Sequence, residues 1–214
     1  MDLAAIQALA APHFLDLFGA FHAEEGDGCP PGTMLLFSPL EPGFWAHVRA
    51  GPEALDGLPD PIDRWSTRVI GGMARALDGT AHFPFGGPPY APFIKWAERT
   101  GRAWPSPVGM LVHDTAGLMI SIRGAIWLEG RLELPAPAGT SPCASCDRPC
   151  ISACPVGALG PRPYDVPACH AFLDTDAGAD CLSGGCLVRR ACPVSRRFGR
   201  DPAQSAHHMR YFHR

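Results

Sequence analysis

The sequence predicts an α/β or α+β domain with a mixed sheet, followed by a smaller domain organised by cysteines. Three observations lead to this prediction. Helix-like and strand-like patterns alternate through residues 1–134, and residues 135–142, P-A-P-A-G-T-S-P, form the clearest linker in the chain. Eight of the nine cysteines then lie between residues 143 and 192. We therefore expect an N-terminal domain over residues 1–134 and a cysteine-rich domain over residues 135–214.

The beginning of the chain is expected to supply the first strands of the sheet. Pro12 interrupts an initial helical segment, and the apolar run that follows has the composition of a strand. Glu41 and Pro42 stand where helices commonly start. In order, the expected elements are a helix at 2–11, a strand at 13–22, a turn-rich loop at 24–32, a buried strand at 33–38 and a helix at 42–50.

The segment from Asp60 to Leu77 has the strongest helical pattern in the chain. Its apolar side chains recur every fourth residue, and two further positions widen the stripe. These residues are Trp65, Val69, Met73 and Leu77, joined by Ile70 and Ala74. Asp60 or Asp63 can cap the start of the helix, and Gly79 is suited to close its end. We expect a capped helix with Trp65 in the core; an anion received at the helix start is the alternative.

The rest of the N-terminal domain is expected to contain three more strands and one helix. The strands are rich in Val, Ile, Leu and Met, and the last two flank a turn at residues 113–117. The expected elements are a strand at 80–85, an irregular loop at 86–92, a helix at 90–99 with Pro92 in its first turn, and strands at 108–113 and 117–128.

Neither a secretory signal nor a membrane span is indicated by the sequence. The N-terminus has no basic start, and Gln7 interrupts its apolar run. No stretch approaches the roughly 18 consecutive apolar residues that a membrane span needs. We expect a cytoplasmic protein with no membrane partner. In that reducing compartment, clustered cysteines bind metal more often than they form disulfides.

The cysteines form two sets that each end in Cys-Pro. The first is the run C-A-S-C-D-R-P-C-I-S-A-C-P at residues 143–155, and the second is spread over residues 169–193. A 4Fe-4S cluster takes four thiolates, so eight cysteines fill two clusters. In bacterial two-cluster ferredoxins, three cysteines of a run share one cluster and the fourth, before proline, joins the other. The same arrangement here gives cluster 1 at Cys143, Cys146, Cys150 and Cys192, and cluster 2 at Cys154, Cys169, Cys181 and Cys186.

Zinc is the main alternative to iron and sulfide, because it also takes sets of four thiolates. Zinc ribbons usually present paired C-x2-C motifs, and neither Cys181 to Cys186 nor Cys186 to Cys192 has that spacing. Disulfides are a weaker alternative. Cys29 stands alone upstream and is expected to be an ordinary free cysteine in a loop.

The cysteine-rich part resembles a known family. The motif C-x2-C-x3-C-x3-C-P-V-G-A-L, then P-A-C-H-A-F, then a last C-P, is similar to the iron-sulfur half of epoxyqueuosine reductase and its ferredoxin-like relatives. The resemblance covers about residues 106–193 and suggests a diverged relative. It implies a ferredoxin-like domain with two 4Fe-4S clusters. It also implies a preceding α/β domain that holds cobalamin, in a family that reduces a modified base in tRNA.

Three functions follow as hypotheses. The first is an electron-transfer protein that delivers electrons from two 4Fe-4S clusters to a redox partner protein. The second is an oxidoreductase whose N-terminal domain binds cobalamin or flavin, with catalytic and cofactor-binding residues unassigned. Aromatic residues of the Pro-rich loops could then line the cofactor, or could simply pack; they are Phe83, Phe85, Tyr90, Phe93, Trp96 and Trp104. The third is a structural cysteine-metal domain that binds RNA or protein.

The C-terminal tail is strongly basic although the net charge of the chain is −3. Residues 187–214 contain a single acid, Asp201, and seven arginines: Arg189, Arg190, Arg196, Arg197, Arg200, Arg210 and Arg214. With His207, His208 and His213, these arginines could bind RNA phosphates or an acidic partner. Alternatively, they could offset the negative charge of the two clusters. His47, His82 and His113 have no ligand-like spacing and are expected to be ordinary histidines.

Overall fold

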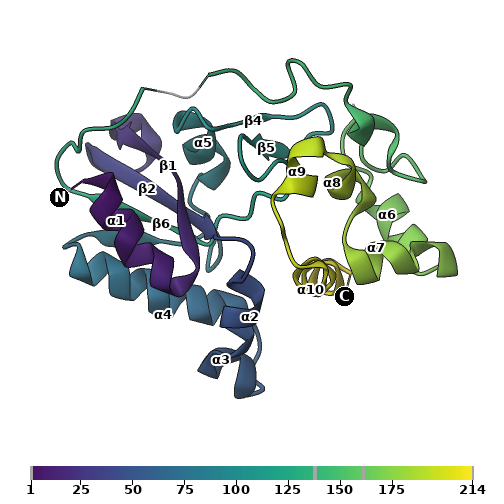
Figure 1. The fold of residues 1–214 in the computed structure, drawn as a ribbon, viewed down its shortest axis with the longest axis horizontal. Helices are drawn as coiled ribbons and strands as arrows, with labels where there is room; N and C mark the ends of the chain where they lie inside the picture. Colours follow the sequence, from purple (N-terminus) through teal and green to yellow (C-terminus); the bar gives the residue numbers. More distant parts are fainter. Residues whose placement is uncertain (1, 137–138, 161, 214) are drawn as a thin grey trace. The chain divides into compact units, whose positions relative to one another are not determined.

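The computed structural model describes residues 2–136, 139–160 and 162–213 and contains two compact units (Figure 1). Unit 1 combines Met1–Arg102 with Ser121–Gly139, and unit 2 combines Ala103–Ile120 with Thr140–Arg214. Residues 103–120 thus belong with the cysteine-rich part although they precede the predicted linker. Residues 137–138 of that linker, and Arg214 of the basic tail, lie outside the described residues.

Unit 1 is built on a four-stranded sheet. Its strands are β1 (Leu15–Ala23), β2 (Gly32–Pro39), β3 (Thr80–His82) and β6 (Gly124–Leu128), in the order β1-β2-β6-β3. The prediction of combined helices and strands is confirmed, but the prediction of a mixed sheet was wrong, because each neighbouring pair is antiparallel. The physical reason is the position of β6. It inserts between β2 and β3, so these two strands, which share a direction and are linked through helices, do not pair.

Helices pack against this sheet, and most of them cover one face. The helices of unit 1 are α1 (Leu3–Ala10), α2 (Phe44–Arg49), α3 (Pro52–Leu55), α4 (Pro61–Ala76) and α5 (Phe93–Arg99), with short 3-10 turns at Ala11–His13 and Glu25–Asp27. Side chains of α1, α2 and α4 join Leu35, Phe37 and Ile126 of the sheet in one apolar core (Figure 1). Strand residues alternate between faces, so Met34 and Leu36 of β2, which are also buried, point the other way.

Helix α4 confirms the strongest pattern in the sequence. Its predicted apolar stripe is buried from Trp65 (1% exposure) to Ala74, and Leu77, just after the last helical residue, is half-buried. Asp60 precedes the helix in a left-handed conformation with φ of 51°, and its side chain makes no capping hydrogen bond. At the other end the N–H of Gly79 donates to the carbonyl oxygen of Ala74 at 2.8 Å, which closes the helix as predicted.

The strands expected around the turn at residues 113–117 do not form a hairpin. β5 (Leu111–His113) pairs with β4 (Ala103–Pro105) in unit 2, whereas β6 pairs with β2 and β3 in unit 1. All that remains of the expected pairing is a bridge between His113 and Gly117. The chain leaves unit 2 at Ile120, so the second predicted strand is reduced to its last five residues.

Unit 2 consists of short helices beside the β4–β5 pair (Figure 1). The helices are α6 (Val166–Leu173), α7 (Ala179–Gly184), α8 (Leu187–Ala191), α9 (Pro193–Arg197) and α10 (Pro202–Phe212), with 3-10 turns at Pro149–Ser152 and Asp176–Gly178. Its apolar core joins Val108, Val112 and Leu118 to Val188 and to cysteines. Among the described helices of both units, none has the length and apolar character needed to cross a membrane.

Candidate metal centre

The nine cysteines are all free thiols in this structure. Cys150 and Cys192 are buried in the core of unit 2, and Cys143, Cys154 and Cys186 pack against it. A core built partly from thiols is less apolar than a core of the same size built from Leu and Ile. We therefore expect a metal centre that binds these cysteines to stabilise the folded state of unit 2.

Four of the predicted ligands gather in one group, which we call group 1: Cys143, Cys146, Cys150 and Cys192. Cys143, Cys146 and Cys192 line a cavity of about 380 Å³ together with exposed polar residues such as Ser145 and Asp147. Cys150 lies close enough to the other three thiols for their charges to raise its pKa, after the larger effect of burial. Group 1 thus joins the first three cysteines of the compact run to the last cysteine of the chain.

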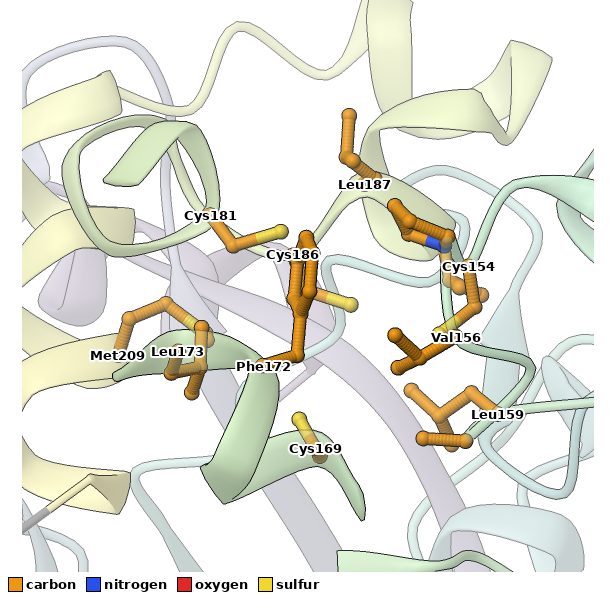
Figure 2. Close-up of a pocket in the computed structure, with 13 residues that line it drawn as sticks. Cys154, Val156, Leu159, Cys169, Phe172, Leu173, Cys181, Cys186, Leu187 and Met209 are labelled. Atoms are coloured by element: carbon orange, nitrogen blue, oxygen red, sulfur yellow. The ribbon is translucent and has the colours of Figure 1, made fainter. Parts of the chain in front are cut away.

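The other four predicted ligands gather in group 2: Cys154, Cys169, Cys181 and Cys186. All four line one pocket, and every other residue of its lining is apolar. Figure 2 shows the thiols of Cys169, Cys181 and Cys186 directed toward a common space, from α6, from α7 and from the residue before α8. The space between the side chains is only about 20 Å³, so binding of a metal centre would require them to move apart.

Helix starts position two of these cysteines. Cys186 immediately precedes α8, and Cys192 immediately precedes α9, whose first residue is Pro193. A residue in this position faces the unpaired N–H groups of the first helical turn. The Cys-Pro dipeptide favours this arrangement, because proline is well suited to the first position of a helix.

The environment of Cys192 stabilises its thiolate. Burial raises the pKa of this thiol, but hydrogen bonds from the N–H groups of Ser195, Leu118 and Val194 and from the Ser195 hydroxyl outweigh burial and lower it. Burial instead raises the pKa of the thiols of Cys143, Cys169 and Cys181. Because metal binding displaces the thiol proton, a metal centre would have to overcome the raised pKa of Cys143, Cys169 and Cys181, whereas the lowered pKa of Cys192 favours its thiolate.

Gly117 brings the backbone close to Cys192. A Cβ atom at this position would lie 2.9 Å from Cys192 Sγ, 2.5 Å from the Ser195 nitrogen and 2.7 Å from Ser195 Oγ. Its φ of +56° also favours glycine. Residue 117 therefore allows the segment before the linker to pack against the start of α9.

Arg189 lies near both groups. Its Nη1 donates a hydrogen bond to the carbonyl oxygen of Leu118, the residue whose N–H contacts Cys192. Burial lowers the pKa of the Arg189 guanidinium, and the negative charge of Cys186 acts in the opposite direction. A guanidinium in this place would offset negative charge on a Cys186 thiolate.

The end of α10 packs beside group 2. His213 Nδ1 lies 2.6 Å from Nδ1 of His170, the neighbour of Cys169, and His213 Nε2 lies 2.9 Å from Asp174 Oδ1. The Tyr164 hydroxyl hydrogen-bonds the Cys169 thiol; burial first, and then this contact, raise the pKa of Tyr164. The C-terminal helix is thereby attached to the element that carries Cys169.

The side chains in each group can be compared with the ligands that a metal centre requires. Each group offers four thiols, which are the ligands of a 4Fe-4S cluster, and the residues present fit that requirement. Within residues 2–136, 139–160 and 162–213, no three His, Cys, Asp or Glu side chains already stand close enough together to hold a single metal ion.

Other residues singled out in the sequence have structural roles or lie at the surface. Trp96 is buried and donates its Nε1 hydrogen to the Asp27 carbonyl oxygen at 2.9 Å, and Phe93 packs against it. Phe83 stacks on Phe85, Tyr90 is 67% exposed, and Trp104 packs on the core of unit 2. Cys29 lies outside both groups, in the loop before β2.

Sequence reasoning missed the hydrogen-bond donors around Cys192. Leu118 and Ser195 are separated by 77 residues, and no periodic pattern relates them. The only available signal was the Cys-Pro dipeptide, which indicates a helix start. Sequence reasoning also missed the cavity that three arginines of the tail line together, Arg190, Arg196 and Arg200.

Comparison of the chain with protein-family models, with curated proteins and with solved structures gives no match. The resemblance to epoxyqueuosine reductase therefore rests on the sequence of about residues 106–193 alone and stays a prediction.

Proposed function

We propose that this protein binds two 4Fe-4S clusters, one at each cysteine group, and transfers electrons to a redox partner protein. The observation that carries the proposal is the gathering of eight cysteines into two groups of four within one compact unit. The grouping follows the crossed ligand pattern of two-cluster ferredoxins, in which Cys154 and Cys192 each join the set that is more distant in sequence.

Residues around the thiols are suited to hold an anionic centre. Nearby N–H groups of Ser195, Leu118 and Val194 act against burial to lower the pKa of Cys192, and the N–H of Arg148 donates to Cys146 Sγ at 3.3 Å. Arg189 adds a fixed positive charge beside Cys186. When bound, a 4Fe-4S cluster supplies reversible one-electron chemistry at a potential set by such hydrogen bonds and by burial.

The surroundings of the two groups differ in a way that suggests where a partner approaches. The residues lining group 2 are apolar apart from the thiols. The cavity of group 1 also includes Ser145, Asp147 and Arg197, all exposed. Because electron exchange between proteins requires close approach, we expect the partner to contact the group 1 side.

A reversible redox titration tests the proposal. Anaerobically isolated protein should show visible absorption that a low-potential reductant bleaches and an oxidant restores, with loss of the signal when Cys150→Ala and Cys181→Ala are combined. Cys29→Ala is the matched control and should leave the titration unchanged. A protein without any reversible redox signal would contradict electron transfer. A spectral change on adding cobalamin or flavin would instead favour the reductase hypothesis.

A further inference from the structure

Charged and apolar residues line the group 1 cavity together with its thiols. The lining includes Arg197 and Asp147, both exposed, and the apolar residues Pro149 and Val194. Arg148 stands between Asp147 and Pro149 in the chain and is also exposed. Interfaces between proteins commonly combine apolar residues with arginine, the charged side chain that is most enriched there. A protein that approaches group 1 would therefore meet Arg148 and Arg197.

Arg148 lies close to the thiols of group 1. Its N–H donates to Cys146 Sγ at 3.3 Å. Burial raises the pKa of the Cys143 thiol, and the positive charge of Arg148 acts in the opposite direction. The φ of Arg148 is 55°, in the left-handed region that favours glycine. An arginine at a position where glycine would be less strained indicates a role for its side chain.

Arg197 comes from a second segment of the chain that meets the first at group 1. It is the last residue of α9, the helix that follows Cys192. Its Nε hydrogen is donated to the Pro193 carbonyl oxygen at 3.3 Å, a contact that orients the guanidinium and engages neither Nη1 nor Nη2. Arg196, its neighbour in the chain, is exposed as well and adds a positive charge at the same end of the helix.

The positive charge beside group 1 is only partly offset within unit 2. Among the described residues, none forms an ion pair with Arg148, Arg196 or Arg197, whereas the neighbouring Arg190 is paired with an aspartate. Asp147 is the one acid among the described residues that line the group 1 cavity. Three arginines therefore outweigh one acid on the side where group 1 is reached.

We propose that Arg148 and Arg197, with the neighbouring charge of Arg196, form a docking surface for an acidic redox partner protein. The inference rests on the proposed function, which makes the partner a redox protein. Opposite charges on the two surfaces speed the encounter and orient the partner, so an acidic surface around its redox centre would be directed toward group 1. The apolar residues Pro149 and Val194 supply the contact that such charges surround.

Binding of a flavodoxin, an acidic protein that carries single electrons on a flavin, tests the inference on the full chain. Surface plasmon resonance should give an association rate constant that falls as salt is added, because salt screens exposed charges. Arg148→Gln and Arg197→Gln should each lower this constant about twofold to fivefold. Asp147→Asn should raise it, because the substitution removes the acid from the cavity lining.

Arg210→Gln is the matched control. It removes the same charge from an exposed site in α10 that does not line the cavity, and it should leave the association rate constant unchanged. Cytochrome c, a basic redox protein, should show no saturable binding. Arg197 has no backbone contact with a thiol, so its variant remains informative if Arg148→Gln disturbs group 1.

Absence of flavodoxin binding overturns the inference, as does an equal loss in Arg210→Gln or equally tight binding of cytochrome c. Binding of a short RNA without binding of flavodoxin also overturns it, in favour of an RNA surface. Reductive bleaching of the same samples reports on the proposed function separately. Arginine-dependent flavodoxin binding by a protein without a reducible centre would uphold the docking surface and contradict the clusters alone.

Discussion

The N–H of Leu118 donates a hydrogen bond to Oγ of Ser195 at 2.9 Å. This bond joins a segment that precedes the predicted linker to the first turn of α9, three residues after Cys192. Both partners are buried, with Ser195 at 4% exposure and Leu118 at 1%. The ligand set that we propose for group 1 therefore depends on residues far from the cysteine motifs.

Ser195→Ala should destabilise unit 2 by about 1–3 kcal/mol, because it removes the buried hydroxyl oxygen that accepts the Leu118 N–H at 2.9 Å. The control is Ser183→Ala, since Ser183 is exposed and its hydroxyl donates only to the Ala179 carbonyl oxygen of its own helix. Urea unfolding followed by circular dichroism measures both variants. If both substitutions lower the free energy of unfolding equally, the hydrogen bond between Leu118 and Ser195 does not contribute to the stability of unit 2.

Gly117→Ala should be more destabilising than Gly157→Ala. Both glycines have positive φ, +56° and +64°, so each alanine carries a backbone cost of about 1–2 kcal/mol. Only at residue 117 would the new Cβ also meet Ser195 and Cys192, which adds about 1–3 kcal/mol for overpacking. The comparison is made by urea unfolding at one pH. If the two variants unfold at the same midpoint, the close packing of Gly117 is refuted.

Single cysteine variants test the crossed grouping. Cys192→Ala and Cys143→Ala should lose the same cluster signal in electron paramagnetic resonance spectra of the reduced protein. Cys154→Ala should lose the signal that Cys169→Ala loses, although Cys154 is close to Cys150 in sequence. Cys29→Ala should retain both signals. A pattern in which Cys154→Ala matches Cys143→Ala would mean that the compact run serves one cluster alone.

Glu53→Gln should destabilise unit 1 by about 1 kcal/mol at pH 7, given that Arg68 is half exposed. Arg68 Nε lies 2.5 Å from Glu53 Oε1, and this hydrogen bond is the main reason that the pKa of Glu53 is lowered from 4.5. A lowered folded-state pKa gives stability that is present above the unfolded pKa and lost as pH falls through the folded pKa.

The difference between wild type and Glu53→Gln should therefore stay constant from pH 7 to about pH 5 and decrease only at more acidic pH. Urea unfolding followed by tryptophan fluorescence gives this difference at each pH. A difference that already shrinks between pH 7 and pH 5 would mean that the pKa of Glu53 is not lowered.

Local patterns predicted the elements well where one helix or strand carries its own signal. The stripe from Trp65 to Leu77 specified α4 because a helix that buries one face must repeat every three to four residues. The antiparallel sheet was not predictable in the same way. The insertion of β6 between β2 and β3 depends on pairing between residues about 90 apart at Met34 and Trp127, and nothing local encodes it.

In the candidate site, too, features encoded by neighbouring residues could be predicted, whereas features formed by residues far apart in the sequence could not. The Cys-Pro motifs and the ferredoxin rule predicted two ligand sets, and the structure places members of each set around one cavity, whereas the ligand sets and metal binding themselves stay predictions. The donors at Leu118 and Ser195 and the pocket at Arg190, Arg196 and Arg200 come from segments that meet only in the folded chain. No repeating pattern of residues in the sequence indicates contacts of this kind.

We propose that two 4Fe-4S clusters occupy the two cysteine groups, and the iron, sulfide and zinc content of anaerobically purified protein tests this proposal. We expect about eight iron and eight sulfide per chain, falling to about half in Cys181→Ala and unchanged in Cys29→Ala. A colourless protein with about two zinc per chain and no sulfide would contradict it and would establish a structural zinc domain in its place.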